Sequence, residues 1–572
     1  MKIHTILSGL MGCAFATGST IQARQGGPNA CRCLPSDDCW PSDNTWDGLN
    51  NTVNGQLVKT VPIGSPCHDP TYDAEACNAL QQRWTQGSLH LPTDSSPMQM
   101  YFANQSCDAF TPRGQPCVLG NYVAYSVKVS QPDDVVAAVK FADKNNLRLV
   151  IRNTGHDFFG RSTGAGALSV WTHHLKSTEV IPNYTSKSYS GPAMRFGAGV
   201  TGAEAAEAAH KAGLTVVVGG CPSVGVAGGF IQGGGHSTLS TTYGLAADQA
   251  LEYEVVTATG AILTASPKKN PDLFWALSGG GGGNYAVVTS VIVRAHEASN
   301  IGGASMQILA GDVTPATYAA IIAKFHELAP QMADSGATIM YILNGLYFNL
   351  APVTVVDSTG DYVRNEVLGE FIDFLDENNV KYAAGFSTLA FRDHYDRYLG
   401  PLPWGSLSSS DYQYGGRLIP RSVVENEPAK LSAAITSLLP DRVIAVGTLG
   451  NFNPPHAVSN AVQPKWRSTL IQLQLLTQWS TKPEDWDAML ANQARMTDDF
   501  VPRIKAVTPD GAAYMNEADF NEPDWKHAFY GESYEQLAKT KKEWDPKGLF
   551  WTLKGVASDQ WTVAEDGKMC RA

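Results

Sequence analysis

The chain has 572 residues, of which 43% are hydrophobic and 17% are charged, and its formal net charge is −12. This length and this composition exclude a disordered or fibrous chain and are typical of a globular protein with two domains around separate cores. The negative charge and the lack of a long basic run exclude nucleic acid and anionic membrane surfaces as partners.

The first 23 residues have the layout of a cleavable secretory signal peptide. Lys2 precedes an apolar core over residues 6–16, and small residues follow up to Ala23. A transmembrane anchor would need roughly 20 continuous apolar residues, and Thr17 already interrupts the run. We therefore expect removal of residues 1–23 and a secreted, extracellular protein. Glycosylation is expected at three sequons, which begin at Asn50, Asn104 and Asn183.

The cysteines single out one thiol. Of the ten cysteines, Cys13 lies in the signal peptide, so an odd number remains in the mature chain. Seven lie in a Cys-rich N-terminal segment over residues 24–117, and Cys570 lies near the C-terminus. Because secreted proteins pair their cysteines, we expect these eight to form four disulfides, in a pairing that the sequence does not fix. Cys221, alone in the middle of the chain, is left over.

From residue 125 the hydrophobic pattern alternates between strands and helices. It predicts two α/β units, with strands over 125–129, 147–151 and 214–218 and helices from Pro132 and over 202–212. Glycine-rich loops, not long helices, fill residues 219–244. The pattern therefore favours a fold whose loops face a ligand over a standard doubly wound sheet. Further strands are expected over 252–257 and 286–294.

After residue 299 the glycine clusters end and longer mixed segments follow. Examples are the apolar stretch 339–350 and a helix expected over 367–375. We interpret residues 299–500 as a second, α+β domain. The stretch 514–561 is rich in aromatic residues and is expected to return to the first domain.

A polar loop directly follows the strand expected over 147–151. It reads Arg152, Asn153, Thr154, Gly155, His156 and Asp157, and shortly after come Gly160, Arg161 and Ser162. A glycine-containing loop that leaves a strand can direct successive backbone N–H groups toward a pyrophosphate, and arginine adds positive charge. The alternative interpretation is an ordinary turn with a surface histidine.

A second loop, over residues 219–236, places one cysteine among many glycines. Its residues include Gly220, Cys221, Val224, Gly225, Gly228, Gly229 and His236. So many glycines indicate a backbone held close to a flat ligand, whereas a flexible linker would not carry the Val, Phe and Ile side chains found here. A third run, Phe274 to Ser278 followed by five glycines from Gly279, fits the same close approach.

Four segments resemble the berberine bridge enzyme-like branch of the vanillyl-alcohol oxidase superfamily. They are the two loops, the Phe-Trp-Ala-Leu run before the five glycines and the sequence from Tyr514 to Asp519. In this family the FAD-binding domain is of the PCMH type. The closing segments over 529–531 and 544–550 are similar to that branch too. The resemblance spans Val118 to Trp561, with four motifs in the family's order. The Cys-rich segment is similar to that of fungal members.

The resemblance implies an α+β fold with two domains. The FAD-binding domain would be discontinuous: residues 118–298 would be completed by a C-terminal segment over 501–565, and residues 299–500 would form a central substrate domain over the flavin ring. The resemblance also implies that His156 bonds the flavin 8α-carbon and Cys221 bonds carbon 6, which accounts for the odd cysteine. Other residues implied to contact FAD are Arg152, Asn153, Thr154, Gly155, Asp157, Gly160, Arg161, Ser162, Gly220, Val224, Gly225, Gly228, Gly229 and Asn516.

The implied activity is that of a secreted flavoprotein oxidase. Such an enzyme transfers a hydride from a small organic alcohol to flavin N5 and is reoxidised by O2 to give H2O2. Family substrates span sugars, aromatic alcohols and secondary metabolites, and this sequence does not choose among them. A valine three residues after the linking cysteine accompanies oxidases, and Val224 stands there. Two alternatives remain: a dehydrogenase with a different electron acceptor, and a catalytically silent binding protein of the same fold.

Alcohol oxidation needs a base for the hydroxyl proton. The resemblance puts His236 and Tyr514 at the active site as candidate catalytic residues. Many plant relatives carry tyrosine at the position of His236 and at that of Glu517. The choice of base therefore stays open. Either candidate could instead be a structural residue that only packs or hydrogen-bonds within its loop. Candidates for stacking on the substrate, with a core position as the alternative, are Trp404, Tyr412 and Tyr414. No metal site is predicted, and the expected partners of a monomer are a small-molecule substrate and O2.

Overall fold

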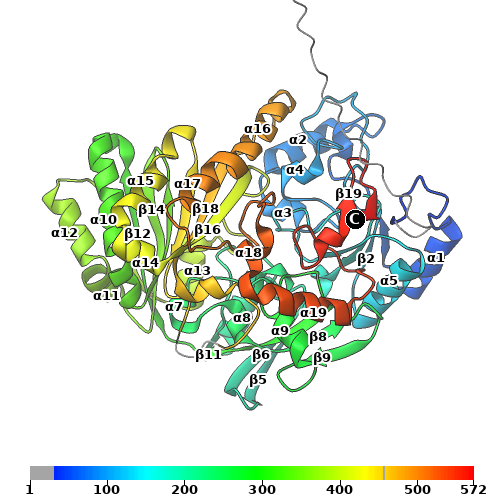
Figure 1. The fold of residues 1–572 in the computed structure, drawn as a ribbon, viewed down its shortest axis with the longest axis horizontal. Coiled ribbons are helices and arrows are strands. Elements are labelled where there is room, and N and C mark those ends of the chain that lie inside the picture. The colour runs from blue at the N-terminus through cyan, green and yellow to red at the C-terminus, as the bar shows by residue number, and fades with distance from the viewer. Residues whose placement is uncertain (1–30, 407, 455–457) are drawn as a thin grey trace, which may run out of the picture.

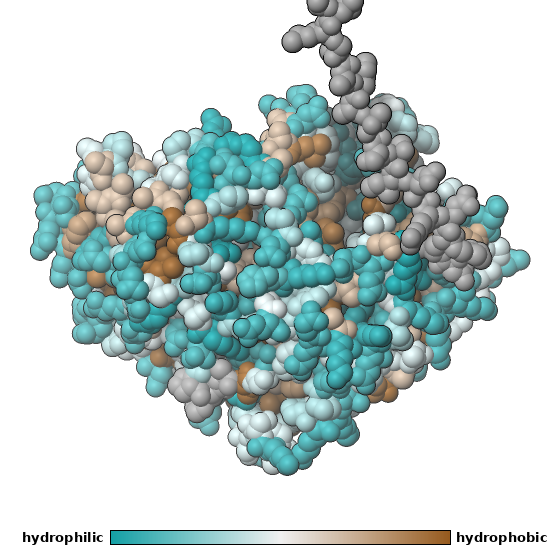
Figure 2. Space-filling view, viewed as in Figure 1, coloured by the Kyte–Doolittle hydropathy of each residue, from teal (hydrophilic) through white to brown (hydrophobic). Residues whose placement is uncertain are grey.

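The computed structural model describes residues 31–406, 408–454 and 458–572. The signal peptide predicted over residues 1–23 lies outside the described residues. In Figure 1 a large sheet with its helices occupies the left of the molecule, and two smaller sheets lie to its right and below. No helix within the described residues is both long and apolar enough to cross a membrane. The face in Figure 2 is mostly hydrophilic, with apolar residues in small separate patches.

A four-stranded sheet carries the first predicted α/β unit. Its strands, in spatial order, are β1 (Leu57–Lys59), β2 (Tyr125–Lys128), β4 (Leu168–Trp171) and β3 (Leu149–Arg152). The strands β2 and β3 both run parallel to β4. Helix α5 (Pro132–Lys144) connects β2 to β3, and Asp134 caps its start by accepting the N–H groups of Ser130 and Gln131. The strands predicted over 125–129 and 147–151 and the helix between them are confirmed.

A five-stranded antiparallel sheet follows. Its strands, in spatial order, are β5 (Thr178–Thr185), β6 (Ser190–Gly197), β10 (Val287–Arg294), β8 (Ala250–Val256) and β9 (Ile262–Ala265). The helix predicted over 202–212 is α6 (Gly202–Lys211). The strand predicted over 214–218 is wrong in its second half, because β7 (Leu214–Thr215) pairs only with the short β11 (His296–Glu297). Residues 216–218 are buried in the core without a strand partner and lead into the glycine-rich loop.

The third sheet has seven antiparallel strands. In spatial order they are β15 (Ala383–Ala390), β12 (Asn300–Leu309), β14 (Tyr347–Val356), β13 (Ala337–Leu343), β17 (Ile444–Leu449), β18 (Thr469–Gln478) and β16 (Tyr412–Pro420). The apolar stretch 339–350 is therefore the hairpin formed by β13 and β14.

Helices and a second hydrophobic core cover one face of this sheet (Figure 1). The helices that contribute to this core are α10 (Pro315–Asp334), α12 (Gly369–Glu377), α14 (Arg421–Asn426), α15 (Pro428–Thr436) and α17 (Val501–Lys505). On β18, Ile471, Leu473 and Leu475 belong to this core. Because successive side chains alternate across a strand, Gln472 and Gln474 lie on the opposite face, where Gln474 contacts Glu517 of the C-terminal segment.

The remaining helices are short and connect or cover these sheets. They are α1 (Asp43–Thr52), α2 (Ala74–Arg83), α3 (Gly87–His90), α4 (Met100–Ala103), α7 (Ser240–Tyr243), α8 (Ala246–Gln249), α9 (Pro271–Leu277), α11 (Gly360–Tyr362), α13 (Phe391–Leu399), α16 (Trp486–Arg495), α18 (Trp525–Tyr530) and α19 (Tyr534–Trp544). A hairpin of β19 (Trp561–Val563) and β20 (Met569–Arg571) ends the chain.

Four disulfides link the eight cysteines that were expected to pair. The bonds are Cys31–Cys570, Cys33–Cys39, Cys67–Cys77 and Cys107–Cys117. Cys221 is the one free cysteine of the described chain, so the prediction from the odd number of cysteines is confirmed. The first bond joins the start of the described chain to its last hairpin, next to the four-stranded sheet.

A buried ion pair attaches the C-terminal segment to the rest of the molecule. Lys541 Nζ donates to Asp545 Oδ2 at 2.6 Å and to the carbonyl oxygen of Asn284 at 2.6 Å. The same amino group donates to the carbonyl oxygen of Phe550, which lies beside Leu149 of β3. The Asp545 side chain is fully buried, and its carboxylate also accepts two backbone N–H groups. Every hydrogen-bonding group of this pair is thus satisfied inside the protein.

Lys541→Met should destabilise the protein by about 3–5 kcal/mol, because it leaves the Asp545 carboxylate buried without its cation. Lys547→Met is the matched control. Lys547 pairs with Asp143 at 2.8 Å, but its side chain is 70% exposed, so its loss should cost about 0–1 kcal/mol. Chemical denaturation followed by far-UV circular dichroism measures both. Equal effects of the two substitutions would contradict the assigned role of Lys541.

Candidate cofactor and active site

The two predicted cofactor loops meet at one hydroxyl group. His156 follows β3, Cys221 follows β7, and Ser223 Oγ lies 3.0 Å from His156 Nε2 and 3.5 Å from Cys221 Sγ. Burial, together with the nearby charge of Arg152, lowers the pKa of His156 to about 4. The imidazole is therefore neutral at neutral pH and retains a nucleophilic lone pair. Burial raises the pKa of the Cys221 thiol.

The loops approach each other so closely that side chains are excluded. Cβ atoms at Gly225 and Gly228 would lie 2.5 Å and 2.9 Å from the amide of Asn153. That amide donates to the carbonyl oxygen of Ala198 at 2.5 Å. The hydroxyl of Thr154 accepts the N–H of Gly225 at 3.3 Å. The glycines of the second loop thus provide room for the polar side chains of the first.

Several predicted cofactor residues instead hold the shape of the first loop. Asp157 accepts the backbone N–H groups of Phe159, Arg161 and Ser162. The φ angles of Gly155 and Gly160 are +79° and +64°, a region that favours glycine. The structure therefore brings Asp157 and Ser162 close to the site as supports of the loop.

The two arginines of this loop reach neighbouring segments. Arg152 is fully buried; it donates to the carbonyl oxygens of His90 and Thr93 in the N-terminal segment, and burial lowers its pKa to about 10. Arg161 donates to the carbonyl oxygens of Met515 and Leu553 in the C-terminal segment. Each guanidinium therefore joins the loop to a distant part of the chain.

The C-terminal segment also binds the second loop. Asn516 Nδ2 donates to the carbonyl oxygen of Gly229 at 2.8 Å and to the hydroxyl of Tyr514 at 2.9 Å. Gly229 is exposed, and a Cβ there would meet nothing within 4 Å. Gly220 borders the large sheet, because a Cβ there would lie 3.1 Å from Met340 Cε. Val224 is half-buried, and its backbone oxygen accepts the N–H of Gly202.

A chain of three polar side chains links the large sheet to His236. Glu517 Oε2 lies 2.8 Å from His236 Nε2 and accepts the Gln474 amide at 2.7 Å. The His236 side chain is 7% exposed and that of Glu517 is 22% exposed. Tyr514 packs edge-on against His236, with ring centroids 5.7 Å apart, and its hydroxyl accepts the N–H of Gly235. Burial, together with the charge of Glu517, raises the pKa of Tyr514.

Of the three aromatic residues predicted to stack on a substrate, the structure brings one to these loops. Tyr414 stacks on Phe158 with ring centroids 3.6 Å apart. Burial raises the pKa of Tyr414, and Cys221 and Glu517 are among the acidic groups that contribute. Tyr412 begins β16. Trp404 is 43% exposed and precedes Gly405, which borders Pro222.

Three contributors were missed in the sequence. Ser223 lies in the glycine-rich loop over residues 219–236, and Phe158 lies in the first loop, between Asp157 and Gly160. Gln474 lies on β18. The signal for Gln474 is the alternation of glutamine with Ile, Leu and Leu along β18, which marks a polar position on a sheet face. Nothing in the sequence indicates that this position meets Glu517.

The loop residues fit FAD. A phosphorylated, hydrogen-bonding cofactor requires unpaired polar groups and room beside the backbone, and Gly229 provides that room. Within these loops, the buried polar atoms with no partner among the described residues are Arg152 Nη1, Asn153 Oδ1, Arg161 Nη2 and Gln232 Oε1. No three His, Cys, Asp or Glu side chains in the described ranges are arranged to hold a metal ion.

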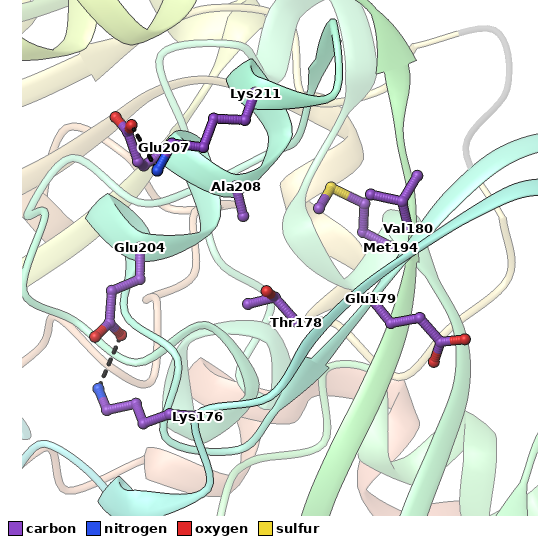
Figure 3. A pocket seen from close by; sticks show the side chains of 9 residues that line it. All are labelled: Lys176, Thr178, Glu179, Val180, Met194, Glu204, Glu207, Ala208 and Lys211. Atoms are coloured by element: carbon purple, nitrogen blue, oxygen red, sulfur yellow. Dashed lines mark hydrogen bonds and ion pairs between the residues drawn. The ribbon is translucent and has the colours of Figure 1, made fainter.

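A surface depression between α6 and the strands β5 and β6 contains none of the predicted site residues (Figure 3). Two ion pairs of its lining are drawn there, Lys176–Glu204 at 2.8 Å and Lys211–Glu207 at 3.2 Å. The depression is distinct from the glycine loops and adds no chemistry to them.

Known proteins with matching sequence and fold define the class. The family described as "FAD binding domain" matches residues 123–266, and "Berberine and berberine like" matches residues 513–557. The chain is 45% identical to FAD-linked oxidoreductase ZEB1 of Gibberella zeae, with 95% of each chain covered. It is 40% identical to VAO-type flavoprotein oxidase VAO615 of Thermothelomyces thermophilus, over 95% of this chain and 96% of that one.

Solved structures of similar proteins support the same class. The VAO-type flavoprotein MtVAO615 from Myceliophthora thermophila C1 has a TM-score of 0.89 at 39% identity and covers 95% of this chain and 100% of its own. Glucooligosaccharide oxidase from Acremonium strictum, which carries 6-S-cysteinyl, 8α-N1-histidyl FAD, shares the fold at 18% identity, with a TM-score of 0.63 over 76% of this chain and 91% of its own. Fold and site therefore define an FAD-dependent oxidoreductase.

The chain belongs to the berberine bridge enzyme-like branch of the vanillyl-alcohol oxidase flavoproteins. The two-domain α+β fold expected from the sequence is that of its structural neighbours.

Proposed function

We propose that the protein is a secreted oxidase that holds FAD on two covalent bonds, from His156 and Cys221, and oxidises a small organic alcohol. The observation that carries this proposal is the meeting of these two nucleophiles at Ser223 Oγ. Among the described residues the eight other cysteines are paired, which leaves Cys221 as a free thiol and supports the proposal.

When bound, FAD supplies the two-electron acceptor chemistry, while the protein supplies orientation and proton handling. We propose that the remaining predicted cofactor residues, from Arg152 to Ser162 and from Gly220 to Gly229 with Asn516, surround it. The proposed FAD-binding domain comprises residues 118–298 and 501–565, and the two family matches fall within these ranges. Residues 299–500 are the proposed substrate domain, whose sheet reaches the loops through Met340 and Gln474.

His236 is the proposed base. If its Nε2–H donates to Glu517, the neutral ring carries its lone pair on Nδ1 and can accept a hydroxyl proton. Gln474, on the sheet of the substrate domain, donates a hydrogen bond to Glu517, and Glu517 contacts His236. The sheet therefore fixes the orientation of His236 through two successive contacts. Tyr514 suits this role less, because its raised pKa keeps its own proton in place at neutral pH. We assign Tyr514 to positioning Asn516 and the loop at Gly235.

Export rests on the signal-peptide layout and on the four disulfides, since disulfides persist in oxidising compartments. Two sequon asparagines, Asn104 and Asn183, are exposed and Asn50 is half-buried, which supports glycosylation at the first two. The proposed partners are a small alcohol and O2, and the proposed state is a monomer.

The purified protein should be yellow, and the colour should stay with the polypeptide after denaturation in acid or detergent. Cys221→Ala should keep the flavin attached through His156, and only the double variant with His156→Ala should release it. Absorbance of the precipitated polypeptide measures attachment. Release of all colour from the wild-type chain would contradict the covalent bonds.

His236→Ala should slow reduction of the flavin by substrate by about 10²–10⁴-fold, the usual contribution of a positioned base. Tyr514→Phe removes one hydrogen-bonding hydroxyl and should slow it by about tenfold or less. Anaerobic stopped-flow absorbance, with the best donor from an alcohol panel scored by peroxide release, separates the two. A larger loss in the tyrosine variant would make Tyr514 the base.

Photoreduced enzyme should react rapidly with O2 and release H2O2. Val224 is half-buried beside Cys221, and a longer side chain there should fill space next to the flavin. Val224→Leu should therefore slow reoxidation and leave flavin attachment unchanged. Stopped-flow mixing with oxygenated buffer measures the rate. Reoxidation over minutes by O2, alongside fast reduction of a quinone, would identify a dehydrogenase instead.

A further inference from the structure

Ser223 lies between the two residues proposed to carry FAD. The residue is 2% exposed, and its hydroxyl oxygen is within hydrogen-bonding distance of both His156 Nε2 and Cys221 Sγ. Gly87, at the start of α3, covers the group, since a Cβ there would lie 3.7 Å from His156 Cε1 and 3.8 Å from Ser223 Oγ. The hydroxyl is therefore confined to the space between the two nucleophiles.

We propose that Ser223 is a positioning residue for the covalent attachment of FAD, with its hydroxyl accepting a hydrogen bond from His156 and donating one to the sulfur of Cys221. The inference rests on the proposed attachment through two bonds. It adds a residue that makes no bond to the cofactor itself.

The single hydrogen of the hydroxyl leaves two possible arrangements of the hydrogen bonds to His156 and Cys221. A hydroxyl has one hydrogen, so it can donate to only one of its two partners. If it donates to Cys221 Sγ, it must accept from His156 Nε2–H, and the neutral ring then carries its lone pair on Nδ1. The opposite direction would use the weak S–H donor and would leave the hydrogen on Nδ1. The first arrangement therefore frees both a nitrogen and a sulfur nucleophile.

The hydroxyl has the larger effect at sulfur. The thiolate, not the thiol, is the nucleophilic form of cysteine. Burial raises the pKa of Cys221, and three donors oppose it: the hydroxyl of Ser223, its backbone N–H and the backbone N–H of Val224. Only the first depends on the side chain. Loss of the hydroxyl should therefore impair the bond from Cys221 more than the bond from His156.

The reaction balances without any chemical change to Ser223. Each attachment removes one hydrogen from a flavin carbon and one from the protein nucleophile, and it forms one carbon–nitrogen or carbon–sulfur bond. The two protons and two electrons released are taken up by dioxygen, which is reduced to hydrogen peroxide. The flavin carbon is the centre oxidised.

The test uses holo-protein purified from a secreting host as wild type and as Ser223→Ala, Ser223→Thr and Ser223→Val. Thiols are titrated after denaturation without reductant, and flavin peptides are mapped by mass spectrometry. Wild type and Ser223→Thr should show almost no free thiol and a peptide pair joined through FAD. Ser223→Ala and Ser223→Val should approach a full equivalent of free Cys221, with FAD on the His156 peptide alone.

The threonine and valine variants form a matched pair of nearly equal shape, so they decide the question even if Ser223→Ala does not fold. Joined peptides in Ser223→Val at the wild-type level would overturn the inference. Loss of the Cys221 bond in Ser223→Thr and Ser223→Val alike would overturn it too, since shape and not the hydroxyl would then be responsible. A wild-type protein with a free Cys221 thiol would instead refute the two-bond attachment on which the inference rests.

Discussion

The architecture of the site depends on the close approach of two loops at the amide of Asn153. Cβ atoms at Gly225 or Gly228 would overlap that amide. Relief of the overlap would need either a new position of the Asn153 side chain, with loss of its hydrogen bond to Ala198, or movement of one loop away from the other. Such a movement would separate His156 from Ser223 and Cys221. The glycines, which contribute no functional group, thus set the distance between His156 and Cys221.

Three parts of the chain, distant in sequence, support that contact. The N-terminal segment accepts hydrogen bonds from Arg152, the C-terminal segment accepts them from Arg161, and the large sheet contributes Gln474. Next to the second loop, Arg467 forms two hydrogen bonds to the carboxylate of Asp248, at 2.8 Å and 2.6 Å. The Asp248 side chain is only 2% exposed. Such a paired, buried carboxylate fixes the glycine-rich region against the sheet in one orientation.

Local patterns in the sequence predicted much of this arrangement. The strands and helix before Arg152 and the isolation of Cys221 follow from periodicity and from the parity of the cysteines. The strand over 214–218 was overpredicted, because a buried apolar run looks the same whether or not a neighbouring strand pairs with it. A strand needs a neighbouring strand for its backbone hydrogen bonds, and within 214–218 only Leu214 and Thr215 pair with one.

The contacts around the proposed base could not be predicted from the sequence. Glu517 binds a histidine 281 residues earlier and a glutamine 43 residues earlier, and both pairings depend on how a tail folds over two sheets. Only the resemblance brought His236 and Tyr514 together, and it offered no means of choosing between them. The difference between the two lies in burial and in the hydrogen bonds of the folded site.

The participation of the tail has a consequence for the biosynthesis of the protein. Asn516 and Glu517 are synthesised after almost all of the chain. Cys570 must also be synthesised before it can pair with Cys31. The loops that hold His156 and Cys221 are translated long before these supports exist. FAD binding in the finished geometry therefore has to follow synthesis of the whole chain.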